Sequence, residues 1–149
     1  MAPRIGDNGL VLEKLSEQVI GAAIEVHRSL GPGLLENTYE ACLMYELVER
    51  KLSVRRQVVL PVVYKGVRVE CGYRLDLLVE DQLIIEVRAC ERLDSIHEAQ
   101  LITYLRLTGL PLGLLINFNV SLLKHGILRR ANTRPPSAPS ANSAVNPLE

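Results

Sequence analysis

Residues Gly72 to Cys90 read GYRLDLLVEDQLIIEVRAC, two apolar segments joined by a short polar one. Because successive residues of a strand face opposite sides, one face of the predicted hairpin is wholly apolar and should belong to the core. That face comprises Leu75, Leu77, Val79, Leu83, Ile85 and Val87. The other face carries Asp76, Glu86 and Arg88, and charges on a half-buried sheet need partners or a function.

The length of the turn decides how the two carboxylates face each other. If Glu80, Asp81 and Gln82 form the loop, Asp76 lies opposite Glu86, with Cβ atoms about 5 Å apart. A two-residue loop at Asp81-Gln82 would make the pair diagonal. Opposed carboxylates repel unless a cation lies between them, and Mg²⁺ or Mn²⁺ prefers such oxygen ligands. The other interpretation is a set of cross-strand ion pairs on a solvated face.

The remaining elements follow from apolar spacing and turn residues. Helices are predicted over residues 12–30, 34–51 and 95–107, the last opened by a capping box of Ser95 and Glu98. Strands are predicted over residues 54–64, 67–79, 83–89 and 111–117, followed by an amphipathic piece over 122–130. This order predicts an α/β sandwich with a mixed sheet. We expect an N-terminal extension at 1–10, one domain at 11–132 and a disordered Pro/Ser/Ala-rich tail at 133–149.

The composition argues against several classes of protein. Seventeen basic residues balance seventeen acidic ones, so no global positive field indicates a polyanionic partner. The three cysteines, Cys42, Cys71 and Cys90, lack zinc-ligand spacing, which favours reduced thiols. No segment resembles a signal peptide or a membrane span. We therefore expect a cytoplasmic protein with no membrane partner. Two local basic clusters, at residues 50–56 and 124–134, could contact phosphates.

Several separated motifs together resemble one known family. Residues Gly33 to Tyr39, GLLENTY, match the signature of the GxxExxY family, and similar segments are VHRSLGPGLLENTYE, GYRLDLLVED, LIIEVRACERL, HEAQLITYLRLTG and GLLINF. That family is placed in the PD-(D/E)XK nuclease-like superfamily. The resemblance implies a restriction-endonuclease-like αβββαβ core, with a mixed central sheet flanked by helices.

The resemblance also implies a site and an activity. Asp76 and Glu86 would be metal ligands, helped by the carbonyl of Val87, and Glu36 would be a third acidic ligand. Gln100 and Tyr104 would line the site, and Arg88 stands where the family usually has lysine. The implied catalytic residues are thus Asp76, Glu86, Arg88 and Gln100, and the cofactor is Mg²⁺ or Mn²⁺.

Three functions stay open at this stage. The first is metal-dependent phosphodiester hydrolysis in DNA or a related nucleic acid, with Arg88 supplying charge but not a base. The second is an inactive relative that binds nucleic acid or a protein. The third is a structural homodimer that uses the apolar surface near residues 111–118.

Overall fold

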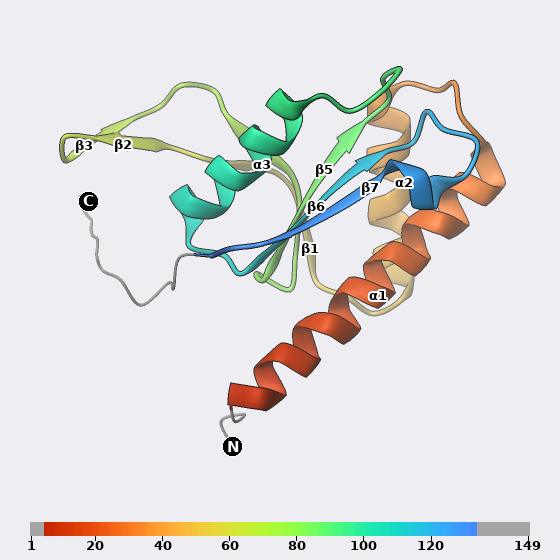
Figure 1. The fold of residues 1–149 in the computed structure, drawn as a ribbon, viewed down its shortest axis with the longest axis horizontal. Helices are drawn as coiled ribbons and strands as arrows, with labels where there is room; N and C mark the ends of the chain where they lie inside the picture. Colours follow the sequence, from red (N-terminus) through yellow and green to blue (C-terminus); the bar gives the residue numbers. More distant parts are fainter. Residues whose placement is uncertain (1–4, 134–149) are drawn as a thin grey trace.

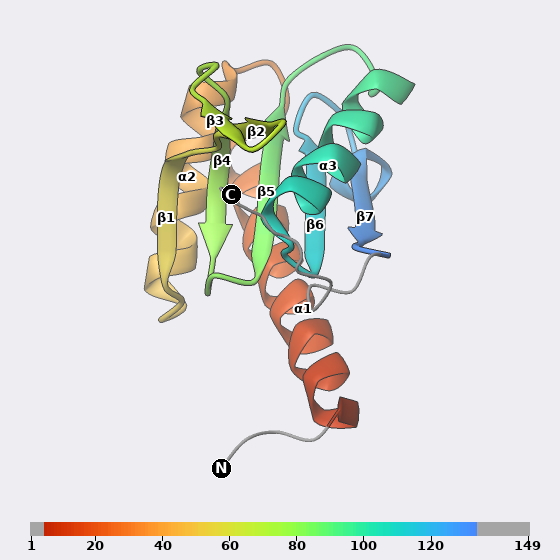
Figure 2. The same cartoon turned by 90° about the vertical axis from the view of Figure 1, so that its left-hand side faces the viewer.

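The computed structural model describes residues 5–133, which fold into a sheet covered by helices on both faces (Figures 1 and 2). The helices are α1 (Ile5–Leu30), α2 (Glu36–Glu49), α3 (Ser95–Thr108) and a short 3₁₀ turn, η1 (Leu123–Gly126). The main sheet contains β1 (Val54–Val59), β4 (Arg74–Val79), β5 (Leu83–Arg88), β6 (Leu112–Asn117) and β7 (Ile127–Ala131). The strands β2 (Val62–Tyr64) and β3 (Val67–Val69) form a separate hairpin. The predicted α/β class is confirmed.

The main sheet is mixed, in the order β1-β4-β5-β6-β7. Its β5–β6 pair is parallel and its other pairs are antiparallel. A parallel pair needs a crossover connection, which α3 supplies. The predicted meander is confirmed as β1, β4 and β5, with the β2–β3 hairpin inserted between its first two strands.

The sheet separates two apolar cores. The helices α1 and α2 pack on one face, over Leu77, Ile85 and Leu114, and α3 packs on the other face (Figure 2). The strand β6 is buried along its whole length, as expected for a strand covered on both faces. The apolar segment at 111–118 therefore lies inside the domain, and the predicted dimer surface there is wrong.

Two of the predicted strands are interrupted. The strand predicted over 54–64 breaks at Leu60-Pro61, because proline has no N–H for the sheet ladder and the N–H of Leu60 donates to the carbonyl of Tyr73. The strand predicted over 67–79 breaks before Arg74, where Gly72 has a φ of 80°. The two breaks are joined by this hydrogen bond, and the β2–β3 hairpin extends beyond it (Figure 1).

Other boundaries also differ from the predictions. The third helix begins at Ser95 with Asp94 as N-cap, and the N–H of Asp94 donates to Nδ1 of His97. The predicted capping box of Ser95 and Glu98 is therefore wrong, because Ser95 is already helical. The segment predicted as an amphipathic piece forms η1 and the edge strand β7.

Two predictions concern the ends of the chain, namely the N-terminal extension and the C-terminal tail. The helix α1 begins at Ile5 and so includes part of the predicted extension. Residues 134–149, most of the predicted tail, lie outside the described residues. Within residues 5–133, no helix combines the length and apolarity needed to cross a bilayer.

The corner between α1 and α2 is fixed by Tyr39. Its fully buried hydroxyl donates to the carbonyl of Gly31 and accepts from the N–H of Leu34, and its ring stacks on Phe118 at 4.5 Å. Gly31 has a φ of 71° and Gly33 a φ of 102°, which glycine adopts without steric cost. The corner sets where α2 begins, and α2 carries Glu36.

We expect Tyr39→Phe to lower the free energy of unfolding by about 1–3 kcal/mol, because two backbone groups would lose their buried partner. Tyr45→Phe is the matched control, since Tyr45 lies on the same helix and is 69% exposed. Urea unfolding would measure both. Equal stabilities of the two variants would show that the hydroxyl does not fix the corner.

Candidate active site

The site lies where the sheet ladder around β4 stops. The three-residue loop at 80–82 pairs Val79 with Leu83, as predicted, and the ladder of β4 and β5 runs as far as Leu77 and Ile85. Continuing this register by one step places Asp76 opposite Glu86. On the other side of β4, Arg56 pairs with Leu77 and Val58 with Leu75, but Gln57, with a φ of 55°, leaves the ladder opposite Asp76.

This break changes the faces of β4. Leu75 packs with Leu78 and Ile84 in the core beneath α3, whereas Leu77 and Val79 pack beneath α1 and α2. The prediction that Leu75 shares a face with Leu77 is therefore wrong. The strict alternation of a strand fails at Asp76, beside the distorted backbone of Gln57.

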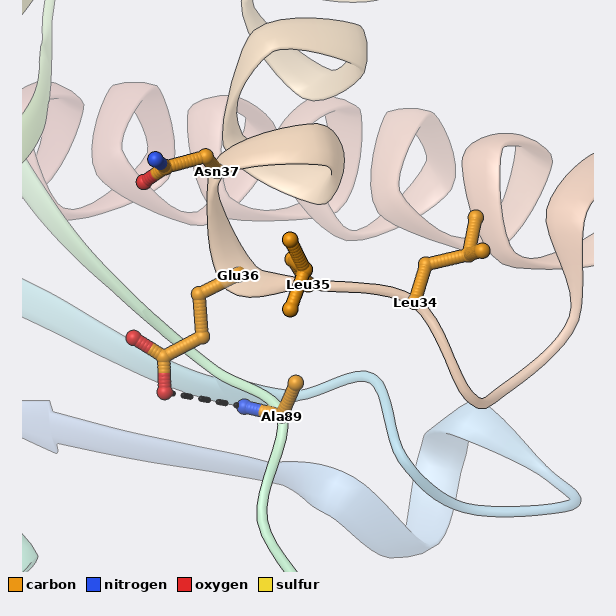
Figure 3. Close-up of a pocket in the computed structure, with 5 residues that line it drawn as sticks. All are labelled: Leu34, Leu35, Glu36, Asn37 and Ala89. Atoms are coloured by element: carbon orange, nitrogen blue, oxygen red, sulfur yellow. Dashed lines mark hydrogen bonds between the residues drawn. The ribbon is translucent and has the colours of Figure 1, made fainter.

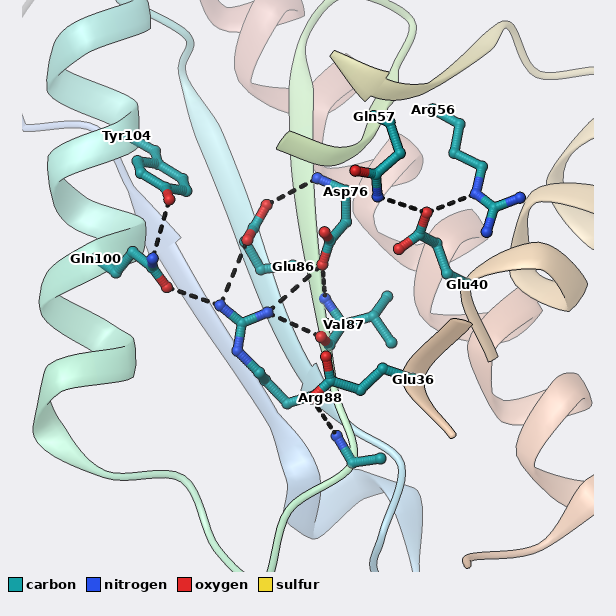
Figure 4. A network of polar contacts seen from close by, with 11 residues as sticks. Glu36, Glu40, Arg56, Gln57, Asp76, Glu86, Val87, Arg88, Gln100 and Tyr104 are labelled. Atoms are coloured by element: carbon teal, nitrogen blue, oxygen red, sulfur yellow. Dashed lines mark hydrogen bonds and ion pairs between the residues drawn. The ribbon is translucent and has the colours of Figure 1, made fainter. Parts of the chain in front are cut away.

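Carboxylates take the place of the missing ladder bonds. Oε2 of Glu86 accepts the N–H of Asp76 at 3.0 Å, and Oδ2 of Asp76 accepts the N–H of Val87 at 2.8 Å (Figure 4). Glu86 is 3% exposed. The two acidic side chains thus bridge β4 and β5, and they converge as predicted.

Arg88 lies over both carboxylates. Its Nη1 atom is 3.5 Å from Oδ2 of Asp76 and 2.8 Å from the carbonyl oxygen of Val87, and its Nη2 atom is 3.5 Å from Oε1 of Glu86. These three oxygens belong to the ligand set that the resemblance implied, which also included Glu36. One guanidinium therefore contacts every implied ligand except Glu36.

The helix α3 holds the far side of the guanidinium. Nη2 of Arg88 donates to Oε1 of Gln100 at 2.7 Å, and Nε2 of Gln100 donates to the hydroxyl of Tyr104 at 2.9 Å. The ring of Tyr104 packs edge-on against Tyr73, 6.2 Å away. Gln100 and Tyr104 thus line the site, as predicted, and they orient Arg88.

Glu36, at the start of α2, is hydrogen-bonded to the backbone next to the site. Its Oε2 atom accepts the N–H of Ala89 at 3.2 Å. It lines an open pocket with Leu34, Leu35, Asn37 and Ala89 (Figure 3). Its position at the carboxyl end of β5 is near the two central carboxylates, but its role as a metal ligand stays a prediction.

Glu40, one helical turn after Glu36, was not predicted. It is 3% exposed, and its Oε2 atom accepts hydrogen bonds from Arg56, at 2.5 Å, and from Gln57, at 2.8 Å. Its charge is one of the causes that raise the pKa of Asp76. The spacing of Glu36 and Glu40 was the available signal, because residues four apart share one helix face.

Burial dominates the electrostatics of the pair. It raises the pKa of Glu86 to about 8, and the charge of Asp76 adds to this shift. Burial also raises the pKa of Asp76, against the opposing hydrogen bond from Val87. The contact of Arg88 with both groups does not offset burial. Ionising both carboxyl groups therefore costs free energy. A cation that is closer than the guanidinium, or doubly charged, would lower that cost.

The donor set of the site consists of two carboxylates and one backbone carbonyl. Among residues 5–133, no three side chains of His, Cys, Asp or Glu are grouped so as to hold a metal. Two carboxylates and a carbonyl do converge on one cationic group, however. Mg²⁺ commonly uses one or two carboxylates and keeps several water ligands, so this oxygen set suffices for such an ion.

The family match agrees with this geometry. A family model described as the PD-(D/E)XK nuclease superfamily matches residues 13–130. The chain belongs to this superfamily. Searches of curated proteins and of solved structures gave no match. The fold is accordingly a restriction-endonuclease-like α/β fold, and the superfamily generally uses divalent metals such as Mg²⁺ on nucleic acid.

Several cations of the two basic clusters have partners within the protein. Arg50 bonds to Glu46, Arg55 to Asp81 and Arg56 to Glu40. In the second cluster, Arg129 bonds to Ser16 and Arg130 to Glu98. Phosphate contact by these clusters stays a prediction.

The shifted pKa of Glu86 predicts how stability depends on pH in metal-free buffer. Between its ordinary value of 4.5 and about 8, the folded state binds more protons than the unfolded state. This stabilising contribution is complete below pH 4.5 and is lost as the pH rises through 8, by at most about 1.4 kcal/mol per pH unit.

We therefore expect Glu86→Gln to flatten the fall in unfolding free energy between pH 5 and 8. Glu91→Gln is the control, because Glu91 is exposed and lies on the loop after β5. Chemical denaturation at several pH values would measure the difference from the unaltered protein. A difference that does not vary with pH would refute the raised pKa.

Proposed function

We propose that this chain is a nuclease of the GxxExxY type that hydrolyses phosphodiester bonds in DNA or a related nucleic acid with Mg²⁺ or Mn²⁺. The observation that carries the proposal is the convergence of Asp76, Glu86 and the carbonyl of Val87 on one cationic group. An arrangement made only for stability would not need two buried carboxylates, because buried ion pairs seldom stabilise more than apolar side chains do.

The signature residues support the assignment to the GxxExxY family. Gly33 has the positive φ that the corner requires, and Tyr39 ties that corner together through its hydroxyl. Glu36 is thereby placed beside the carboxyl end of β5. The signature thus has a physical reading, in which two residues shape the corner and the third faces the site.

The residues divide the work as follows. Asp76 and Glu86 would hold the ion, with Glu36 as the third acidic ligand. When bound, the ion supplies a Lewis acid that withdraws charge from phosphoryl oxygens and favours deprotonation of water. Arg88 presents planar donors that suit two phosphate oxygens, and Gln100 orients those donors. Arg88 cannot accept a proton, so a base must come from elsewhere.

We expect the protein to cleave plasmid or single-stranded DNA in the presence of Mn²⁺. Asp76→Asn and Glu86→Gln should each lower the cleavage rate by about 100-fold or more, because each removes charge from the ion's ligands. The measurement is the initial rate at saturating Mn²⁺, with EDTA as the metal-free reference.

Glu49→Gln is the matched control, since Glu49 is an exposed acidic residue at the end of α2, away from the site. It should cleave at the rate of the unaltered protein. Cleavage that survives both Asp76→Asn and Glu86→Gln would come from another site or a contaminant, and the proposal would fail.

The contacts of Arg88 favour a second candidate, a relative that binds nucleic acid without cleaving it. The guanidinium contacts the predicted ligand oxygens and cannot serve as a base, whereas lysine can lose its proton. In this candidate the fold and the phosphate contact remain, and turnover does not.

Arg88→Lys separates the two candidates. If the unaltered protein binds but does not cut, we expect Arg88→Lys to produce Mn²⁺-dependent cleavage at least about 10-fold above background, since a general base contributes about 10²–10⁴-fold. Fluorescence anisotropy with a labelled oligonucleotide would measure binding in parallel. Cleavage by the unaltered protein that Arg88→Lys leaves unchanged would exclude the second candidate.

A further inference from the structure

The guanidinium of Arg88 occupies a position that a bound cation would need. Its two terminal nitrogens lie 2.8–3.5 Å from Oδ2 of Asp76, Oε1 of Glu86 and the carbonyl oxygen of Val87. Oxygen ligands of Mg²⁺ lie at about 2.1 Å from the ion. An ion bound by these three oxygens would therefore overlap with the guanidinium in its present position.

The guanidinium is also held from the opposite side. Gln100 presents its carbonyl oxygen to Nη2 at 2.7 Å, and its amide nitrogen is occupied by the hydroxyl of Tyr104. Because Tyr104 is 5% exposed, this amide orientation is set by a buried partner. Figure 4 shows the chain of contacts from α3 through Arg88 to the carboxylates of β4 and β5.

The charges of Asp76 and Glu86 favour a cation at this position. When both carboxyl groups are ionised, they place two negative charges in a buried setting, and like charges at this spacing need a counter-ion. The side chain of Arg88 is only 16% exposed, so its charge is weakly screened by solvent. With Arg88 in place, the site has a cation before any ion arrives.

We propose that Arg88 is a built-in occupant of the cation site, latched by Gln100, so that a divalent ion binds only when the guanidinium is released. This inference rests on the proposed metal site. Release has a second consequence: the guanidinium, freed from the carboxylates, becomes available to a phosphate oxygen. Arg88 therefore exchanges one anionic partner for another, and Gln100 acts as a positioning residue.

Manganese affinity tests the exchange. The Kd for Mn²⁺, measured by electron paramagnetic resonance of the free ion and by calorimetry, should fall at least tenfold in Arg88→Met. Gln100→Met keeps Arg88 but removes the latch, and its Kd should lie between the other two. Arg74→Met is the control, because Arg74 is exposed and only two residues before Asp76. Its Kd should match that of the unaltered protein within twofold.

A spectroscopic measurement distinguishes displacement from simple charge repulsion. In ¹⁵N-labelled protein, the guanidinium signal of Arg88 should shift on Mg²⁺ titration, with the same midpoint as binding. An unchanged Arg88 signal at saturating Mg²⁺ would overturn the exchange. Asp76→Asn, introduced with Arg88→Met, should abolish the tight Mn²⁺ binding, which places the ion at these carboxylates.

The outcomes separate this proposal from the nuclease proposal. If Arg88→Met and Gln100→Met bind Mn²⁺ no more tightly than the unaltered protein, or if no folded variant binds Mn²⁺, the exchange is wrong. If Arg88→Met binds tightly while the unaltered protein never cleaves DNA, the exchange stands and hydrolysis fails. Gln100→Met decides the question should Arg88→Met not fold.

Discussion

The structure of the site depends on two carboxylates that replace backbone hydrogen bonds between β4 and β5. An antiparallel pair that parts leaves buried N–H groups without partners, and such groups are costly. Here Glu86 accepts the N–H of Asp76, and Asp76 accepts the N–H of Val87. The backbone groups at the end of the ladder therefore keep hydrogen-bond partners, and those partners are the carboxylates of the site.

This exchange has an electrostatic cost that determines the rest of the site. Acceptors with two lone-pair oxygens satisfy the backbone, but they bring two charges into a buried place and raise the pKa values of both carboxyl groups. On the α3 side, Arg88 pairs with both carboxylates, and it is hydrogen-bonded to Gln100, which is hydrogen-bonded to Tyr104. On the α2 side, Glu40 forms an ion pair with Arg56 and accepts a hydrogen bond from Gln57.

The sequence predicted the features that follow from local rules. A three-residue loop at 80–82 was enough to place Asp76 opposite Glu86, because register in a hairpin follows from loop length. The loop length was not enough to predict which face of the sheet Leu75 occupies. That depends on the positive φ of Gln57, which lies on β1, a strand that pairs with β4 through tertiary contacts. The same limit applies to Glu40, because its hydrogen-bond partners come from β1. It also applies to β7, because its apolar spacing suits a helix as well as a strand.

The difference between arginine and lysine gives the site its particular character. Lysine is a compact charge on a flexible stem, and it can lie beside a metal ion without spanning the ligands. The guanidinium is planar and carries donors at both ends, so one side chain contacts Asp76, Glu86 and the carbonyl of Val87 together. The same width lets its far edge reach Gln100 on α3. A lysine at position 88 would carry the same charge on a single ammonium group, without the planar pair of donors that lets one side chain contact both carboxylates and Gln100.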